Sequence, residues 1–244
     1  MTALSDPEVD GVIALRGGHG CAELLPRLDP AVLRQHPKPL IGFSDVTALH
    51  AWAQQAGVVS FYGPTVFRFA HEPDPLTAQR LLDVLRGDGT GSVPWQPSDR
   101  KPRSLVAGTA RGTLRGGWLT GLVHLLGTPW EPDLTGAVVL LEEVSQPPQT
   151  VDRMLLHLQL AGKLDDVAGF VVGELADCAP EDHPEARQGR TLEDVLERRL
   201  GGYGVPVLYD VPLGHGTSLA TVPLGVEVTL DGTELVVTEP ALQP

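Results

Sequence analysis

The chain has 244 residues, of which 42% are hydrophobic and 20% charged, so it is long and apolar enough to fold as one large or two modest globular domains. Its formal net charge is −13, from 18 Lys and Arg against 31 Asp and Glu without a basic cluster, which argues against nucleic acid or an anionic membrane as a partner. Cys21 and Cys178 are its only cysteines and form no C-x-x-C pair, so the sequence indicates neither a disulfide framework nor a cysteine-based metal site.

The N-terminal segment, MTALSDPEVDG, has no basic stretch followed by an apolar one. No apolar run in the chain reaches the length of a membrane span, about eighteen residues. We therefore expect a cytoplasmic protein that does not associate with a membrane.

Short apolar runs alternate with helical patterns along the chain. One such pattern is formed by Val151, Met154, Leu155 and Leu158. Continuously apolar strands separated by helices indicate a parallel sheet that is covered on both faces, so the predicted fold class is α/β. The predicted strands cover residues 12–15, 40–42, 58–61, 137–141, 170–173 and 205–208.

A segment without periodicity, GDGTGSVPWQPSDRKPRS over residues 87–104, has the composition of a linker or long loop. It divides the chain into two predicted lobes, which is a usual arrangement around a small-molecule cleft. We expect a Rossmann-like lobe with a parallel sheet over 1–88, a linker over 89–108 and an α/β lobe with some antiparallel strands over 109–244. In the second lobe, GVEVTLDGTELVVTEP predicts a strand pair that turns at Asp231 and Gly232.

The stretch PLIGFSDVTALH places Ser44 between a predicted strand and an amphipathic pattern that begins at Val46. Taken alone, Ser44 is most simply a helix N-cap, with Asp45 in the first turn near the positive end of the dipole. The alternative is a nucleophile elbow, in which a tight turn exposes the hydroxyl and the next N–H helps to form an oxyanion hole. The elbow pattern Gly-x-Ser-x-Gly is incomplete here because Val46 stands at its last position.

A serine nucleophile needs a base, and the sequence contains eight histidines. His50 and His157 fall within helical patterns and His183 within a polar stretch, so we expect structural or solvent-facing roles for them. His215 lies between two glycines in PLGHG, just after a predicted strand, and is the best candidate.

The acid that would orient the base is best assigned to Glu142, which ends the apolar run GAVVLLEEV at the edge of a predicted sheet strand. A solvated loop beginning at Glu142 and Glu143 is the simpler alternative. The order Ser44, Glu142, His215 matches the order Ser, acid, His of α/β-hydrolases, which is weak support.

Gly17, Gly18 and Gly20 in ALRGGHG also follow a predicted strand, so their N–H groups could approach a ligand closely. The pattern is not Gly-x-Gly-x-x-Gly and no suitably placed acidic residue follows, which argues against a dinucleotide site. A plain glycine turn is the alternative.

Several of these segments together resemble the LD-carboxypeptidases, a family that includes murein tetrapeptide carboxypeptidases and microcin immunity peptidases. The resemblance runs from about residue 6 to the C-terminus and rests on several separate segments. They are RGGHGCAELLPRLD, IGFSDVTALH, GVVSFYGP, GTLRGGWLTGLVHLLGTPWEPDLTGAVVLLEEV, VDRMLLHLQLAGKL and PLGHGTSLATVPLG.

The resemblance implies a Ser-Glu-His triad at Ser44, Glu142 and His215, and an oxyanion hole from the N–H groups of Asp45 and Gly18. It implies release of terminal D-alanine from cytoplasmic murein tetrapeptide during cell-wall recycling, with no metal or cofactor, by a homodimer. As substrate-binding residues we add Arg16, Gly17 and Trp118. Arg16 could pair with a substrate carboxylate, and a structural ion pair is an equal alternative.

The chain departs from the family in two places. The family segment GGNLS reads GGWLTG here, so Trp118 replaces an amide side chain whose hydrogen bonds an indole cannot reproduce. Family members also carry about sixty to seventy residues, enough for about two βα units, before the segment that matches DPEVDG. The first lobe is therefore predicted to be truncated and to lack its first strand, which would expose a strand edge.

Three hypotheses follow. The leading one is a serine LD-carboxypeptidase that acts on murein tetrapeptide. The second is a microcin-immunity type of serine peptidase or amidase that hydrolyses a peptide-nucleotide or acyl-amino-acid amide. The third is an inactive truncated remnant that only binds peptide.

Overall fold

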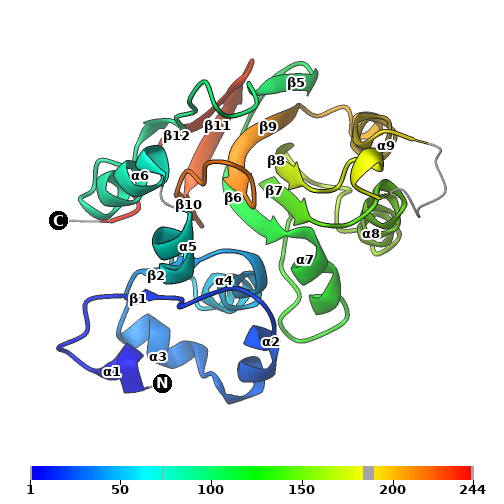
Figure 1. Ribbon diagram of the computed structural model, residues 1–244. Coiled ribbons are helices and arrows are strands. Elements are labelled where there is room, and N and C mark those ends of the chain that lie inside the picture. The colour runs from blue at the N-terminus through cyan, green and yellow to red at the C-terminus, as the bar shows by residue number, and fades with distance from the viewer. Residues whose placement is uncertain (1, 73, 184–189, 243–244) are drawn as a thin grey trace.

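The structure is a computed structural model that describes residues 2–72, 74–183 and 190–242. Its strands form two sheets (Figure 1). The smaller sheet has the order β1-β2-β3-β10, in which β1, β2 and β3 are parallel and β10 is antiparallel to β3. Its strands are β1 (Val12–Ile13), β2 (Leu40–Gly42), β3 (Ser60–Tyr62) and β10 (Val222–Leu224).

The larger sheet has eight strands in the order β4-β12-β11-β6-β7-β8-β9-β5. The four central strands, β6 to β9, are parallel, and the outer strands pair antiparallel. The bounds are β4 (Gly91–Ser92), β5 (Arg103–Val106), β6 (Thr109–Trp118), β7 (Ala137–Val144), β8 (Gly169–Ala176), β9 (Val207–Gly214), β11 (Glu227–Asp231) and β12 (Glu234–Val237).

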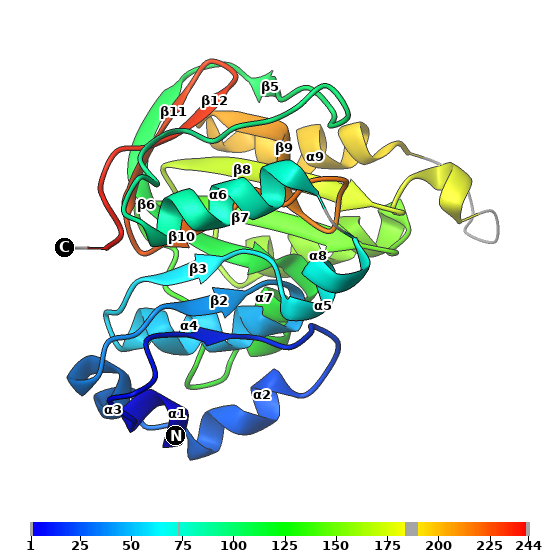
Figure 2. The same cartoon turned by 60° about the vertical axis from the view of Figure 1, so that its left-hand side comes forward.

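Helices surround both sheets. Helix α4 packs beside the smaller sheet (Figure 2), and α8 and α9 lie side by side on one face of the larger sheet (Figure 1). The α-helices are α1 (Thr2–Ser5), α2 (Cys21–Leu24), α3 (Pro30–Gln35), α4 (Thr47–Gln55), α5 (Val66–His71), α6 (Pro75–Leu85), α7 (Leu119–Leu125), α8 (Pro148–Leu160) and α9 (Leu192–Leu200). Short 3₁₀-helices are η1 (Leu25–Arg27), η2 (Ser44–Val46), η3 (Pro180–Asp182) and η4 (Gly201–Tyr203).

The side chains of β7 show how the two sheets are joined. Successive residues of a strand point to opposite faces, so Val139 and Leu141 pack under the helices α7, α8 and α9. Val138 and Leu140 point the other way, into a core that also contains Phe43 and Tyr62. This shared core holds the carboxyl end of β2 against the end of β7, which is where the candidate site forms.

The expected α/β class is confirmed, with parallel and antiparallel strands in two sheets. Each of the six predicted strands overlaps an observed strand. The predicted strand pair is present as β11 and β12, but its turn lies at Gly232 and Thr233, one residue later than predicted, because Asp231 still pairs with Glu234. The sequence did not predict β6, the longest strand described. The division into lobes over 1–88 and 109–244 stays a prediction. Segment 89–108 carries β4 and β5 of the larger sheet, and β10 joins the smaller one.

Candidate functional site

The structure brings Ser44, His215 and Glu142 together in one chain of hydrogen bonds. Ser44 follows β2 in the chain, Glu142 lies near the end of β7, and His215 comes directly after β9. Ser44 Oγ is 3.1 Å from Nε2 of His215, and Nδ1 of His215 is 2.7 Å from Oε2 of Glu142. A carboxylate only accepts hydrogen bonds, so Nδ1 carries the imidazole proton and Nε2 is free to accept from the serine.

Ser44 sits on a strand-to-helix turn with a backbone φ of 64°. This left-handed conformation costs a serine roughly 1–2 kcal/mol. Such strained backbone conformations are concentrated at functional sites, where the surrounding structure imposes them. The N-cap interpretation of Ser44 is therefore wrong. An N-cap residue has an extended backbone, and here that residue is Phe43, whereas Ser44 is the first residue of η2 and its side chain does not cap the helix. The turn is tight: a Cβ on Gly42 would lie 2.8 Å from Val46 Cγ2, so glycine is required there.

Glu142 is fully buried rather than part of a solvated loop. Its second oxygen, Oε1, accepts a hydrogen bond of 2.5 Å from the Tyr62 hydroxyl. Two glycines make room for the side chain: a Cβ on Gly214 would lie 2.3 Å from Oε2, and one on Gly173 would lie 3.1 Å from Glu142 Cβ. The carboxylate thus occupies a slot that fixes its direction toward His215.

His215 is held on several sides. Burial lowers the pKa of its imidazole, but the charge of Glu142 and the hydrogen bond to it outweigh burial and leave the pKa above its ordinary value. The ring packs against Phe43 at a centroid distance of 4.8 Å. The loop after it is clamped by Arg68 of α5, whose Nη2 donates to the carbonyls of Gly216 at 2.6 Å and Thr217 at 2.9 Å.

The glycine segment lies against the serine. A Cβ on Gly17 would come within 2.9 Å of Ser44 Cβ, and Gly18 has a φ of +112°. Asp45 ties this segment to η2, because its Oδ2 accepts a hydrogen bond of 2.8 Å from Cys21 N–H. Its own N–H lies in the first turn, where helical N–H groups have no intrahelical acceptor.

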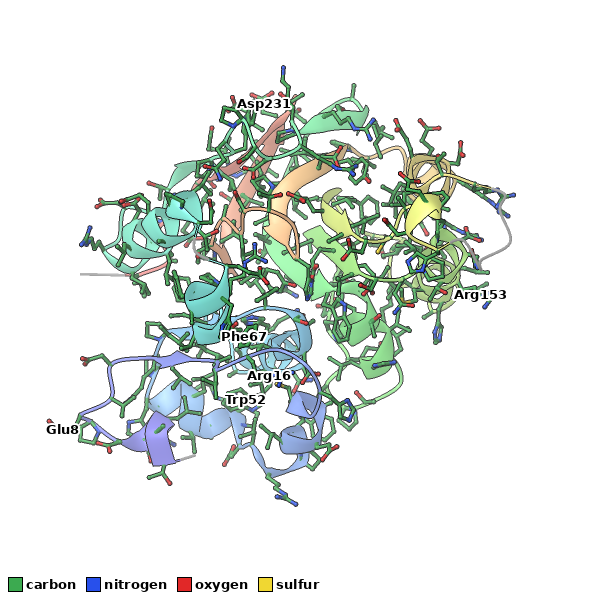
Figure 3. The ribbon with its side chains drawn as sticks, viewed as in Figure 1. Glu8, Arg16, Trp52, Phe67, Arg153 and Asp231 are labelled. Atoms are coloured by element: carbon green, nitrogen blue, oxygen red, sulfur yellow. The ribbon has the colours of Figure 1, made fainter. Side chains whose placement is uncertain are left out.

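The two remaining candidates for substrate contact differ in their surroundings. Arg16 is exposed and has no ion pair or hydrogen bond with any part of the chain that the structure describes. It lies near Phe67, whose N–H donates to the Leu15 carbonyl (Figure 3). Trp118 is half-buried, and its indole N–H donates to Oε1 of Glu143 at 2.5 Å. The Trp118 indole therefore fixes the carboxylate of Glu143, the residue next to Glu142.

A cavity of about 510 Å³ opens beside His215. Its wall includes Glu174, Asp177 and Arg100, so it is polar and carries both signs of charge. Among the described residues there is no group of three or more His, Cys, Asp or Glu that could hold a metal ion, and no helix long and apolar enough to cross a membrane.

Sequence reasoning missed three residues of this site: Tyr62, Glu143 and Arg68. Glu143 is fully buried and accepts hydrogen bonds from the N–H and the hydroxyl of Thr120 besides the Trp118 indole. Burial raises its pKa, and these hydrogen bonds work in the opposite direction. Tyr62 stands in GVVSFYGP, one of the segments that carried the resemblance, but nothing in that pattern indicates where its hydroxyl points.

Comparison with known families matches residues 1–63 to the LD-carboxypeptidase N-terminal domain and residues 111–230 to the LD-carboxypeptidase C-terminal domain. The chain belongs to the LD-carboxypeptidase family. This confirms the resemblance seen in the sequence and assigns the chain to a family of peptidases.

Three relatives illustrate the range of the family. A Synechocystis protein, named provisionally as a carboxypeptidase, is 38% identical over 95% of this chain and 73% of its own length. The solved muramoyltetrapeptide carboxypeptidase of Oxalobacter formigenes is 30% identical and has a TM-score of 0.84 over 98% of this chain and 82% of its own.

The third relative, the microcin C7 self-immunity protein MccF of Escherichia coli, is 29% identical over 93% of this chain and 72% of its own length. A structure of MccF in complex with glutamyl sulfamoyl guanosine has a TM-score of 0.86 and is 26% identical over 99% of this chain and 79% of that one.

Proposed function

We propose that this chain is a serine LD-carboxypeptidase that removes terminal D-alanine from murein tetrapeptide in the cytoplasm, as part of cell-wall recycling, and that it acts as a homodimer. The observation that carries the proposal is the chain of hydrogen bonds from Ser44 through His215 to Glu142. Both distances lie within the range of about 2.6–3.2 Å that proton transfer between a nucleophile and its base requires.

The proposed reaction has two halves. His215 Nε2 takes the proton of Ser44 as Oγ attacks the scissile carbonyl carbon, and Glu142 stabilises the imidazolium that forms. The tetrahedral intermediate collapses when the C–N bond breaks and His215 protonates the departing amine of D-alanine. Water, deprotonated by His215, then attacks the acyl-Ser44 ester and releases the shortened peptide, with the serine proton restored.

The N–H groups of Asp45 and Gly18 are proposed to bind the oxyanion, each contributing about 3 kcal/mol to the barrier reduction. Gly17 is proposed to keep the nucleophile accessible, because a Cβ at this position would lie 2.9 Å from Ser44 Cβ and 3.1 Å from Ser44 Oγ. Arg16 is exposed and unpaired within the described residues, which suits a partner for the terminal carboxylate of the substrate. For Trp118 we propose a role in shaping the site through Glu143.

The similarity to MccF favours a second candidate. A site of the same residues could hydrolyse an amide that joins an amino acid to a nucleotide-like group, and MccF is known in complex with glutamyl sulfamoyl guanosine. The two candidates share the nucleophile and differ in the leaving group.

The test compares the purified protein with Ser44→Ala on two substrates, murein tetrapeptide and an aminoacyl sulfamoyl nucleoside. D-alanine release by the first protein and a loss of at least about a thousandfold in the second are expected. A preference for the nucleoside by kcat/KM would favour the MccF-like reaction. Tight peptide binding without turnover, in a protein shown to be folded, would instead support an inactive remnant.

A further inference from the structure

The hydroxyl of Tyr62 lies between Glu142 and Ser44, and the proposed reaction gives it no role. Tyr62 ends β3 of the smaller sheet and is fully buried. Its hydroxyl donates to Glu142 Oε1 at 2.5 Å and accepts from the backbone N–H of Ser44 at 3.3 Å. The assignment of donors is fixed by chemistry, because a carboxylate cannot donate and a phenol has a single proton.

One oxygen atom thus contacts both ends of the hydrogen-bond chain. Among the described residues, Tyr62 and His215 supply the hydrogen bonds to the Glu142 carboxylate, one to each oxygen. The contact to Ser44 holds the backbone of the residue whose φ of 64° is otherwise unfavourable. It also shows that the N–H of Ser44 is already engaged, which leaves the oxyanion to other donors.

We propose that Tyr62 is a positioning residue that couples Glu142 to the backbone of Ser44 and so sets both the geometry of the nucleophile and the basicity of His215. This inference rests on the proposed role of Ser44 as a nucleophile. Tyr62 acts through its neighbours, because a side chain with 0% exposure does not touch substrate.

The phenol is suited to this task because it stays protonated. Burial and the adjacent Glu142 carboxylate both raise the pKa of Tyr62 well above its ordinary value. The ring itself is held by Phe43, at a centroid distance of 6.4 Å, and by His50, at 5.7 Å. Tyr62→Phe keeps these ring contacts and removes the hydroxyl, with its hydrogen bonds to Glu142 and Ser44 and its interaction with the Thr47 side chain.

The loss of the hydroxyl changes the charge balance at His215 in a defined direction. Without this donor the Glu142 carboxylate is less stabilised and attracts the imidazolium more strongly, so the pKa of His215 rises further. The other charged groups that face His215 or its loop are Glu143 of β7, Glu174 of β8 and Arg68 of α5, and none of them is altered. A purely structural role for Tyr62 would leave this pKa unchanged.

The first test is a titration of the His215 ring by NMR in the free protein, in wild type and Tyr62→Phe. It requires no substrate, so it remains informative if the proposed function fails. Tyr209→Phe is the matched control, because Tyr209 is also buried, in β9, and its hydroxyl has no hydrogen bond within the part of the chain that the structure describes. We expect a rise in the pKa of His215 in Tyr62→Phe and none in Tyr209→Phe. An unchanged pKa would overturn the inference.

The second test measures activation of Ser44 directly, by the rate of covalent labelling with a fluorophosphonate and by D-alanine release. In Tyr62→Phe we expect labelling and kcat to fall about ten- to a hundredfold with KM within about twofold. In a Glu142→Gln background the same change should cost much less, because the shared partner is already altered. Equal losses in both backgrounds would contradict coupling through Glu142. Labelling without D-alanine release would remove the proposed substrate and leave the inference intact.

Discussion

Gly214 offers a test of how closely the site depends on the Glu142 carboxylate. It has a φ of +97°, and a Cβ built on it would lie 2.3 Å from Glu142 Oε2 and 2.6 Å from Cδ and Cγ. Ordinary van der Waals contact begins at 3.4 Å, so in Gly214→Ala the carboxylate must move by about 1 Å. Misplacing a catalytic group by that amount costs on the order of a hundredfold in rate, which is the loss we expect in kcat.

Gly87→Ala is the matched control for the backbone. Gly87 has a similar φ of +91° with open space around a Cβ. Both variants should lose about 1–2 kcal/mol of unfolding free energy from backbone strain, and Gly214→Ala about 1–3 kcal/mol more from crowding. D-alanine release and urea denaturation are measured on both proteins. If folded Gly214→Ala loses no more activity than Gly87→Ala, the position of the Glu142 carboxylate does not depend on the absence of a side chain at residue 214.

Two further predictions concern the surroundings of the site. Arg68→Met removes the donor to the carbonyls of Gly216 and Thr217, so D-alanine release should fall at least about tenfold. Unchanged release by the folded variant would show that these hydrogen bonds are not needed for activity. His50 is buried, and burial lowers its pKa to about 4, so the unfolded chain binds its proton first as the pH falls. His50 should therefore contribute a loss of about 3 kcal/mol of unfolding free energy between about pH 6.5 and pH 4. In urea denaturation, His50→Gln, which does not titrate, should lose less than the wild type over that range, and equal losses would contradict this assignment.

The elements that sequence reasoning found are those with a strong local signal. The apolar runs around residues 40–42 and 137–141 form β2 and β7, and the alternating pattern on either side of Gly232 forms the paired strands β11 and β12. The strand β6 was missed because its sequence, TARGTLRGGW, is rich in glycine and charge. Its conformation comes from pairing with β7 and β11, which no local pattern reports.

The residues of the candidate site also differ in whether a local sequence signal predicts them. Ser44, Glu142 and His215 stand at the ends of strands, where chain position alone makes them candidates. The Tyr62 hydroxyl lies 80 residues from Glu142 and 18 from Ser44, so its contacts depend on how the two sheets pack. The N-cap interpretation of Ser44 failed for a related reason: the left-handed backbone is imposed by the tight strand-to-helix turn, and local propensity argues against it.

In the proposed reaction, Ser44 forms a covalent bond with the part of the substrate that remains after the terminal residue leaves. The most direct measurement is acid-quench mass spectrometry of the protein during turnover of murein tetrapeptide, followed by mapping of the modified peptide. We expect an ester on Ser44 whose acyl group has the mass of the substrate without D-alanine, and no adduct in Ser44→Ala. D-alanine release that survives in Ser44→Ala, or an adduct on another residue, would contradict the proposed reaction.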